Sequence, residues 1–307
     1  MEDYLIEDGL VYSEDSLICH GLDLKFKNKL EKITIKEGCT TIAPSAFDSD
    51  VLLQEVVLPS TLRKIEKSAF KNSAISKINF PDNLATIEAL AFSDCQNLTK
   101  INLSNTKVEI LGGRCFSYCL FLKEVLLPNT LKQIKGECFY RCPLRKIVLP
   151  ELVTRIESRA FMDCAFLEEI VFPINAKNFI ISPGVFEECT NLEEITLPIN
   201  LERISACMFK ECENLKTITN LKDLNKLIII ETSAFENCTN LKRVTLPRHL
   251  KQISYDCFRK CKALTKIENF HEIEVFLTAH SNKKSSISHL LEDCSSLKEI
   301  LISNIEK

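Results

Sequence analysis

Phenylalanine recurs along most of the chain at a nearly constant interval. The spacing between successive members is 22 to 26 residues. A period of this size is typical of proteins built from stacked structural repeats. A single repeat of this length cannot bury its own apolar side, so neighbouring repeats must stack to form a continuous core. The sequence therefore predicts a repeat solenoid. The ten members are Phe47, Phe70, Phe92, Phe116, Phe139, Phe161, Phe186, Phe209, Phe235 and Phe258.

Each repeat carries the same apolar pattern around its phenylalanine. An Ile or Leu stands five residues before it, and most repeats place Cys three residues after it, Leu six after it and Ile or Val nine after it. Alternation such as Lys100-Ile101-Asn102 predicts a strand at the last of these positions. Phe and Cys three residues apart share one face of a short helical turn. We predict a parallel sheet of about eleven to twelve rungs of ~23 residues each, mainly β with short helical turns.

The pattern resembles the BspA-like leucine-rich repeat family, in a cysteine-rich variant. The resemblance covers residues 30–302. It implies a solenoid that binds a ligand or a partner, often on a cell surface, and it supplies no catalytic residue and no cofactor. The residues that carry it are Cys138, Phe139 and Cys142 in one repeat and Phe258, Cys261, Leu264 and Ile267 in another.

The two ends of the chain depart from the repeat. Residues 1–29 contain short apolar runs separated by Asp8-Gly9, a hairpin signal, and we predict that they form an N-terminal cap. The solenoid is expected over 30–302, with an insertion at 269–290 that forms an exposed loop, and 303–307 is a tail. The insertion holds His271, His280 and His289, whose spacing fits no helix or strand face. Solvated loop histidines are favoured over ligands or a proton shuttle.

The fifteen cysteines are expected to be reduced. In-line neighbours on stacked rungs are spaced too widely for good disulfide geometry, and buried free cysteine packs as a small hydrophobe. Four thiols, of Cys115, Cys119, Cys138 and Cys142, match the number that a tetrahedral zinc ion takes. Their spacing is longer than structural zinc sites usually show, so we predict packing and no metal. Catalytic and phosphate-binding motifs are missing, and the chain is not expected to be an enzyme.

Composition limits the partners and the location. The net charge of −3 gives no basic excess for nucleic acid, and no apolar run is long enough for a membrane span. The N-terminus lacks the pattern of a signal peptide. As written, the sequence predicts a cytoplasmic protein, which the reduced cysteines support. The alternative, implied by the resemblance, is the cell surface.

The outward side chains of the predicted strands form the candidate binding face. Leu126, Val148 and Val171 recur at one position and predict an exposed apolar stripe with charged borders, a feature of interaction sites. The alternative is that these residues simply favour strands. The candidate residues are Lys100, Asn102, Glu124, Leu126, Lys146, Val148, Glu169, Val171 and Glu194.

Three functions are compatible with this sequence. The first is a non-catalytic protein–protein interaction scaffold that uses the sheet face to bind a protein partner. The second is a cell-surface adhesin that binds host matrix or glycan, and the third is a recognition module of a larger complex. Since no obvious cap follows the last repeat, self-association through the C-terminal coil is a further expectation.

Overall fold

The structure, a computed structural model, describes residues 4–173, 178–270, 274–276, 290–297 and 299–300. The chain divides into two units, Met1–Val153 and Thr154–Lys307. Both are β-solenoids, with about 11 turns of ~23 residues in all and almost no helix, which confirms the predicted fold class. The division into a cap at 1–29, a solenoid at 30–302 and a tail at 303–307 stays a prediction, and the tail lies outside the described residues.

The first unit begins with three strands that lead into the stack. They are β1 (Tyr4–Glu7), β2 (Leu10–Ser13) and β3 (Ile18–Leu22). β1 and β2 pair antiparallel through a turn in which Asp8 and Gly9 have φ of 50° and 80°. Two positive φ values in a two-residue loop match the right-handed twist of the flanking strands. β3 then pairs parallel with the first repeat strand, placing Cys19 beside Ile42.

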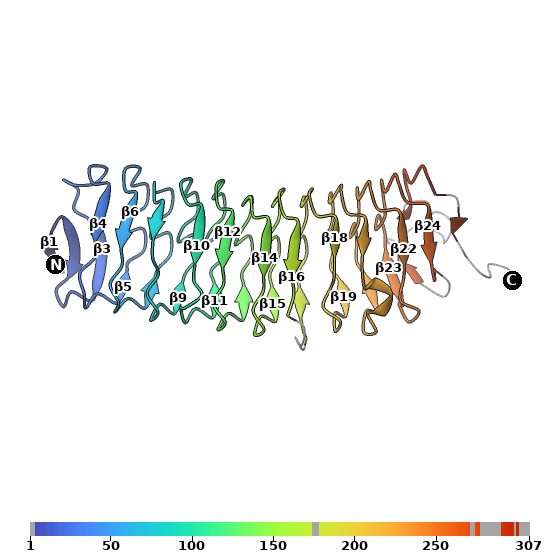
Figure 1. The fold of residues 1–307 in the computed structure, drawn as a ribbon, viewed down its shortest axis with the longest axis horizontal. Helices are drawn as coiled ribbons and strands as arrows, with labels where there is room; N and C mark the ends of the chain where they lie inside the picture. Colours follow the sequence, from blue (N-terminus) through green and yellow to red (C-terminus); the bar gives the residue numbers. More distant parts are fainter. Residues whose placement is uncertain (1–3, 174–177, 271–273, 277–289, 298, 301–307) are drawn as a thin grey trace. The chain divides into compact units, whose positions relative to one another are not determined.

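Every full turn of the first unit contributes two strands, whereas the sequence predicted one. We call sheet 1 the strands that end five residues before each phenylalanine. We call sheet 2 the predicted strands that follow each phenylalanine, which lie in chain order in Figure 1 but pair in separate groups of two or three in the described part of the chain. Sheet 1 holds β5 (Thr41–Ile42), β7 (Lys64–Ile65), β9 (Thr86–Ile87), β11 (Ile110–Leu111) and β13 (Gln133–Ile134). Sheet 2 holds β4 (Lys32–Thr34), β6 (Glu55–Val57), β8 (Lys77–Ile78), β10 (Lys100–Asn102), β12 (Glu124–Leu126) and β14 (Lys146–Val148).

The second unit repeats the arrangement. Its sheet 1 strands are β15 (Arg155–Ile156), β17 (Ile180–Ile181), β19 (Arg203–Ile204), β21 (Ile229–Ile230), β23 (Gln252–Ser254) and β25 (Glu274–Phe276). Its sheet 2 strands are β16 (Glu169–Val171), β18 (Glu194–Ile195), β20 (Thr217–Ile218), β22 (Arg243–Thr245), β24 (Lys266–Glu268) and β26 (Glu299–Ile300). A 3-10 turn, η1 (Leu221–Asp223), follows β20.

The predicted insertion at 269–290 is not a loop throughout. β25 lies inside it and pairs parallel with β23 in register, so this segment continues sheet 1. The prediction of an exposed loop was wrong for these residues, because their backbone finds a neighbouring strand with unpaired groups to bond. Residues 271–273 and 277–289, with His271, His280 and His289, lie outside the described part of the chain.

The repeated phenylalanines form the centre of each unit. All ten side chains are buried. In the first unit, consecutive rings from Phe47 to Phe139 stack with centroids 5.1, 5.2, 5.5 and 5.7 Å apart and near-parallel planes. In the second unit, rings from Phe161 to Phe258 stack at 6.0, 5.7, 5.5 and 5.4 Å. The rungs of a parallel stack are about 4.8 Å apart, so identical side chains must meet face to face.

The backbone around each phenylalanine differs from the expected helical turn. Two residues before and two after it, φ is positive, as at Ser45 (53°) and Ser49 (61°) beside Phe47. Alternate N–H groups therefore point along the stack: those of Ser45, Phe47 and Ser49 donate to carbonyls of the next turn at 3.0, 2.7 and 2.8 Å. The segment is a run of tight turns that forms a third ladder of hydrogen bonds between rungs.

Candidate binding face of sheet 2

The strands of sheet 2 alternate between core and solvent. Ile101 is 1% exposed, whereas Lys100 and Asn102 on either side of it are exposed. The same exposed–buried–exposed pattern holds in β12, β14 and β16. Successive side chains of a strand point to opposite faces, so each three-residue strand presents two outward side chains on a backbone fixed by its neighbours.

In the first unit, the structure places all six candidate residues on this outward face. β10 and β12 pair parallel, with Lys100 beside Glu124 and Asn102 beside Leu126. The Lys100 ammonium and the Glu124 carboxylate are 2.8 Å apart. Leu126 is 39% exposed and Val148, on β14, is 53% exposed. The unit therefore presents apolar side chains beside charged ones on consecutive strands, with Lys146 also exposed on β14.

In the second unit, the remaining candidates are outward as well. Glu169 and Val171 flank the buried Ile170 on β16, and Glu194 is exposed on β18. A groove of about 700 Å³ runs along these two strands and is lined by Val171, Glu194 and Ile199 among others. This groove has an apolar floor with carboxylates on its border.

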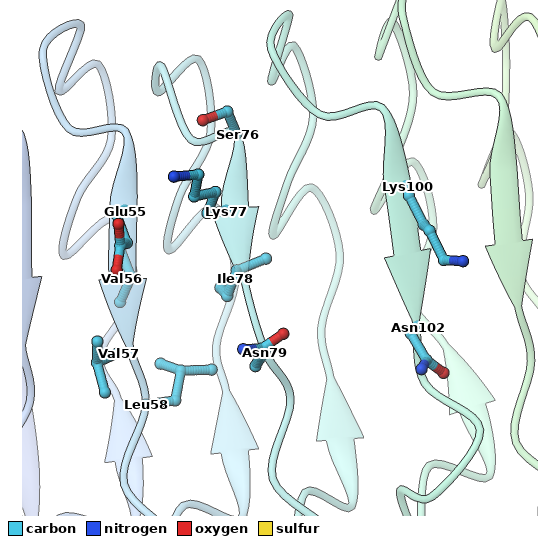
Figure 2. Close-up of a pocket in the computed structure, with 10 residues that line it drawn as sticks. All are labelled: Glu55, Val56, Val57, Leu58, Ser76, Lys77, Ile78, Asn79, Lys100 and Asn102. Atoms are coloured by element: carbon cyan, nitrogen blue, oxygen red, sulfur yellow. The ribbon is translucent and has the colours of Figure 1, made fainter.

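A second groove, on the first unit, was not predicted. It measures about 500 Å³ and crosses β6, β8 and β10, as Figure 2 shows. Its lining includes Val57, Lys77, Asn79, Lys100 and Asn102. Two of these, Lys100 and Asn102, were candidates from the sequence. The others lie on the neighbouring turns and were not among the candidates, because they do not belong to the predicted apolar stripe.

The turn that leads into the groove is one residue shorter than most. The turn of Phe70 reaches its next core residue, Ile75, in five residues, whereas the turn of Phe92 takes six to reach Leu98. β8 is only two residues long, and β8 and β10 belong to separate sheets in the described part of the chain. Ile78 on β8 is half-buried, although the equivalent Val56 and Ile101 are buried. The spacing of 22 residues from Phe70 to Phe92 recurs from Phe139 to Phe161, where β14 is three residues long and Ile147 is buried, so the spacing alone does not mark the groove.

The cysteine column has a structural role. All fifteen cysteines are free thiols, and thirteen of them are buried. The Cys95 thiol donates to the Phe70 carbonyl of the preceding turn at 3.1 Å, and the Cys212 thiol donates to the Phe186 carbonyl at 3.0 Å. Burial raises the pKa of Cys95 to about 12, so its thiol stays protonated and keeps its donor. Cysteine thus supplies both a small apolar group and a hydrogen-bond donor at this position.

The four thiols considered for zinc are placed differently from one another. The sulfur atoms of Cys115 and Cys138 are 3.4 Å apart, whereas Cys119 and Cys142 donate to the carbonyls of Phe92 and Phe116. Among the described residues, no three His, Cys, Asp or Glu side chains are arranged to hold a metal ion. All four side chains are buried in the core of the first unit.

Within the described ranges, no helix combines the length and the apolar character that crossing a membrane requires. No curated protein shows significant sequence similarity to the chain.

Solved structures share the fold. A leucine-rich repeat protein from Bacteroides ovatus is 19% identical, with 97% of this chain and 98% of that chain covered and a TM-score of 0.62. The pneumococcal vaccine antigen PcpA is 19% identical, with 99% of each chain covered and a TM-score of 0.56. A leucine-rich cell surface protein from Faecalibacterium prausnitzii is 21% identical, with 99% and 96% covered and a TM-score of 0.52. At these identities the likeness shows the fold alone.

A family model agrees with the solved structures. The BspA type leucine rich repeat region, a model of six copies, matches residues 24–142, 109–227 and 179–307. These matches extend over most of the chain and include the regular turns of both units. The chain belongs to the BspA-type leucine-rich repeat family.

Proposed function

We propose that the chain is a non-catalytic scaffold that binds a protein partner through the outward face of sheet 2. The observation that carries the proposal is the pair of exposed apolar side chains, Leu126 and Val148, on consecutive strands of the first unit. Apolar side chains that remain exposed beside charged neighbours are characteristic of interaction surfaces. Their strands are fixed by the stack beneath them, so binding costs little conformational entropy.

The family membership supports binding rather than catalysis, since repeat solenoids of this kind present extended surfaces to partners. We therefore place the activity in recognition alone.

The test compares proteins captured from an extract of the source cells by three baits. Val148→Glu places a charge on the proposed face. Leu152→Glu is the matched control, because Leu152 is 52% exposed, close to the 53% of Val148, but lies in a turn outside the strands. We expect a partner retained by the wild type and by Leu152→Glu to be lost with Val148→Glu. Retention of the same proteins by all three baits, each shown to be folded by circular dichroism, contradicts the proposal.

A cell-surface binder is the second candidate. It is supported by the similarity to the F. prausnitzii protein, which is described as a cell surface protein. Labelling intact source cells with a membrane-impermeant amine reagent separates the two locations. Modification of this chain on intact cells supports the surface binder, and modification only after lysis supports a cytoplasmic scaffold.

A further inference from the structure

The charged side chains on the first strands of sheet 2 follow an alternating order that fails between β8 and β10. The first outward residues of β4, β6, β8, β10 and β12 are, in that order, Lys32, Glu55, Lys77, Lys100 and Glu124. Neighbours of opposite sign pair: Lys32 with Glu55 at 2.7 Å and Lys100 with Glu124 at 2.8 Å. Lys77 and Lys100, however, are like charges on consecutive turns. Like charges on consecutive strands repel each other, so an anion placed between them would be stabilised.

The break in charge order coincides with the break in the sheet. β8 and β10 are the strands that carry these two lysines, and they do not pair with each other. Figure 2 shows the side chain of Lys77 directed towards β6 and that of Lys100 directed away from β8. The groove of about 500 Å³ lies over this place. Two long cationic side chains that can swing inwards thus border a space between unpaired strand edges.

Lys77 is the cation with the least compensation here. Its parallel neighbour on β6 is Glu55, whose carboxylate is already hydrogen-bonded by Lys32. Lys77 makes no ion pair within the described ranges. An acidic group entering the groove would therefore meet one ammonium that shares Glu55 with Lys32. It would also meet the ammonium of Lys100, which is paired with Glu124 and whose side chain is 52% exposed.

The next outward residues along the chain carry amide groups instead of charges. Asn79 and Asn102 line the groove two residues beyond the lysines. The Oδ1 atom of Asn102 accepts from the backbone N–H and the hydroxyl of Ser104, which leaves its amide nitrogen as a donor. Side-chain amides both donate and accept, as a peptide backbone requires. Two residues of a strand rise about 6.6 Å, which is also the distance between alternate residues of an extended peptide.

From this we propose that the groove over β6, β8 and β10 binds an extended acidic peptide segment of the partner. One carboxylate lies between Lys77 and Lys100, and the amides of Asn79 and Asn102 bond the peptide backbone. Val57, 40% exposed at the groove border, packs against an apolar neighbour in that segment. The inference rests on the proposed function, because the groove belongs to the same outward face of sheet 2.

The test uses a fluorescein-labelled peptide of alternating Glu and Thr, with a Gln and Thr peptide of equal length for comparison, and follows fluorescence anisotropy at low and high salt. The double variant Lys77→Gln/Lys100→Gln is expected to weaken binding of the acidic peptide by about tenfold, as expected for the loss of two exposed charge contacts. Lys132→Gln is the matched control and is expected to change nothing. Lys132 is also 52% exposed and 2.8 Å from a carboxylate, that of Glu109, but it stands beside sheet 1.

Two results overturn the inference. One is equal binding of the acidic peptide by the wild type and the double variant, or equal binding of the two peptides. The other is preferential binding of a galacturonate oligosaccharide that is lost in the double variant, which assigns the lysines to an acidic glycan. The test of this groove and the test of the proposed function can fail independently of each other. Partner capture that depends on Val148 but not on the lysines refutes the peptide groove alone.

Discussion

Replacing Phe235 by Leu tests whether stacking of the phenylalanine column stabilises the solenoid. Phe235 is fully buried, and its ring lies between those of Phe209 at 5.5 Å and Phe258 at 5.4 Å, with planes within 10° of parallel. Leucine keeps most of the apolar volume, and such swaps cost up to about 1.5 kcal/mol. Each lost aromatic pair adds about 0.5–1.5 kcal/mol. With two pairs lost, these predict a loss of about 1–4.5 kcal/mol in the free energy of unfolding.

The measurement is urea unfolding followed by far-ultraviolet circular dichroism. Phe121→Leu serves as the control, because Phe121 is 56% exposed in a turn and its replacement is expected to cost no more than about 0.5 kcal/mol. If Phe235→Leu costs no more than this control, the column does not stabilise the protein through ring stacking. A loss that far exceeds the range points instead to a cavity that the neighbouring turns fail to close.

Two further predictions concern a glycine pair and a buried acid. Gly112→Ala is expected to lower the unfolding temperature sharply, because the added Cβ would lie 2.3 Å from the Glu88 carbonyl carbon. Gly113→Ala is expected to have a mild effect, because its Cβ would meet nothing closer than 3.4 Å. Equal unfolding temperatures of the two variants in calorimetry would contradict this prediction. The Asp50 side chain is 1% exposed, and its Oδ2 atom has no hydrogen-bond partner in the described structure. Burial raises the pKa of the carboxyl group, although its Oδ1 atom accepts a hydrogen bond from the backbone N–H of Asn28. A raised folded-state pKa means that stability falls as pH rises above the unfolded value of about 3.9, so Asp50→Asn should stabilise the fold at neutral pH and have no effect near pH 3. Urea unfolding at both pH values checks the sign, and an equal gain at both refutes the assignment.

The candidate face illustrates how far a repeat carries a site prediction. Once Ile101 is assigned to the core, strand alternation alone sends Lys100 and Asn102 to solvent, and the structure places them there. The role of these residues in binding stays a proposal. The groove at β8 escaped prediction because the turns of Phe70 and Phe139 are shortened alike, and only the first is followed by a two-residue strand with a half-buried isoleucine.

The sequence by itself determined the solenoid, its period and its buried columns. Identical apolar residues at a constant interval can be buried only if the turns stack in register, so Phe70 must lie on Phe47 and Ile65 beside Ile42. Tertiary structure alone decided the second strand of each turn and the backbone around each phenylalanine. Strands of two residues, such as Thr86–Ile87, are too short to show an alternating pattern. Positive φ falls on residues as different as Ser45 and Leu90, because the hydrogen bonds between turns, and not the residue type, hold that conformation in place.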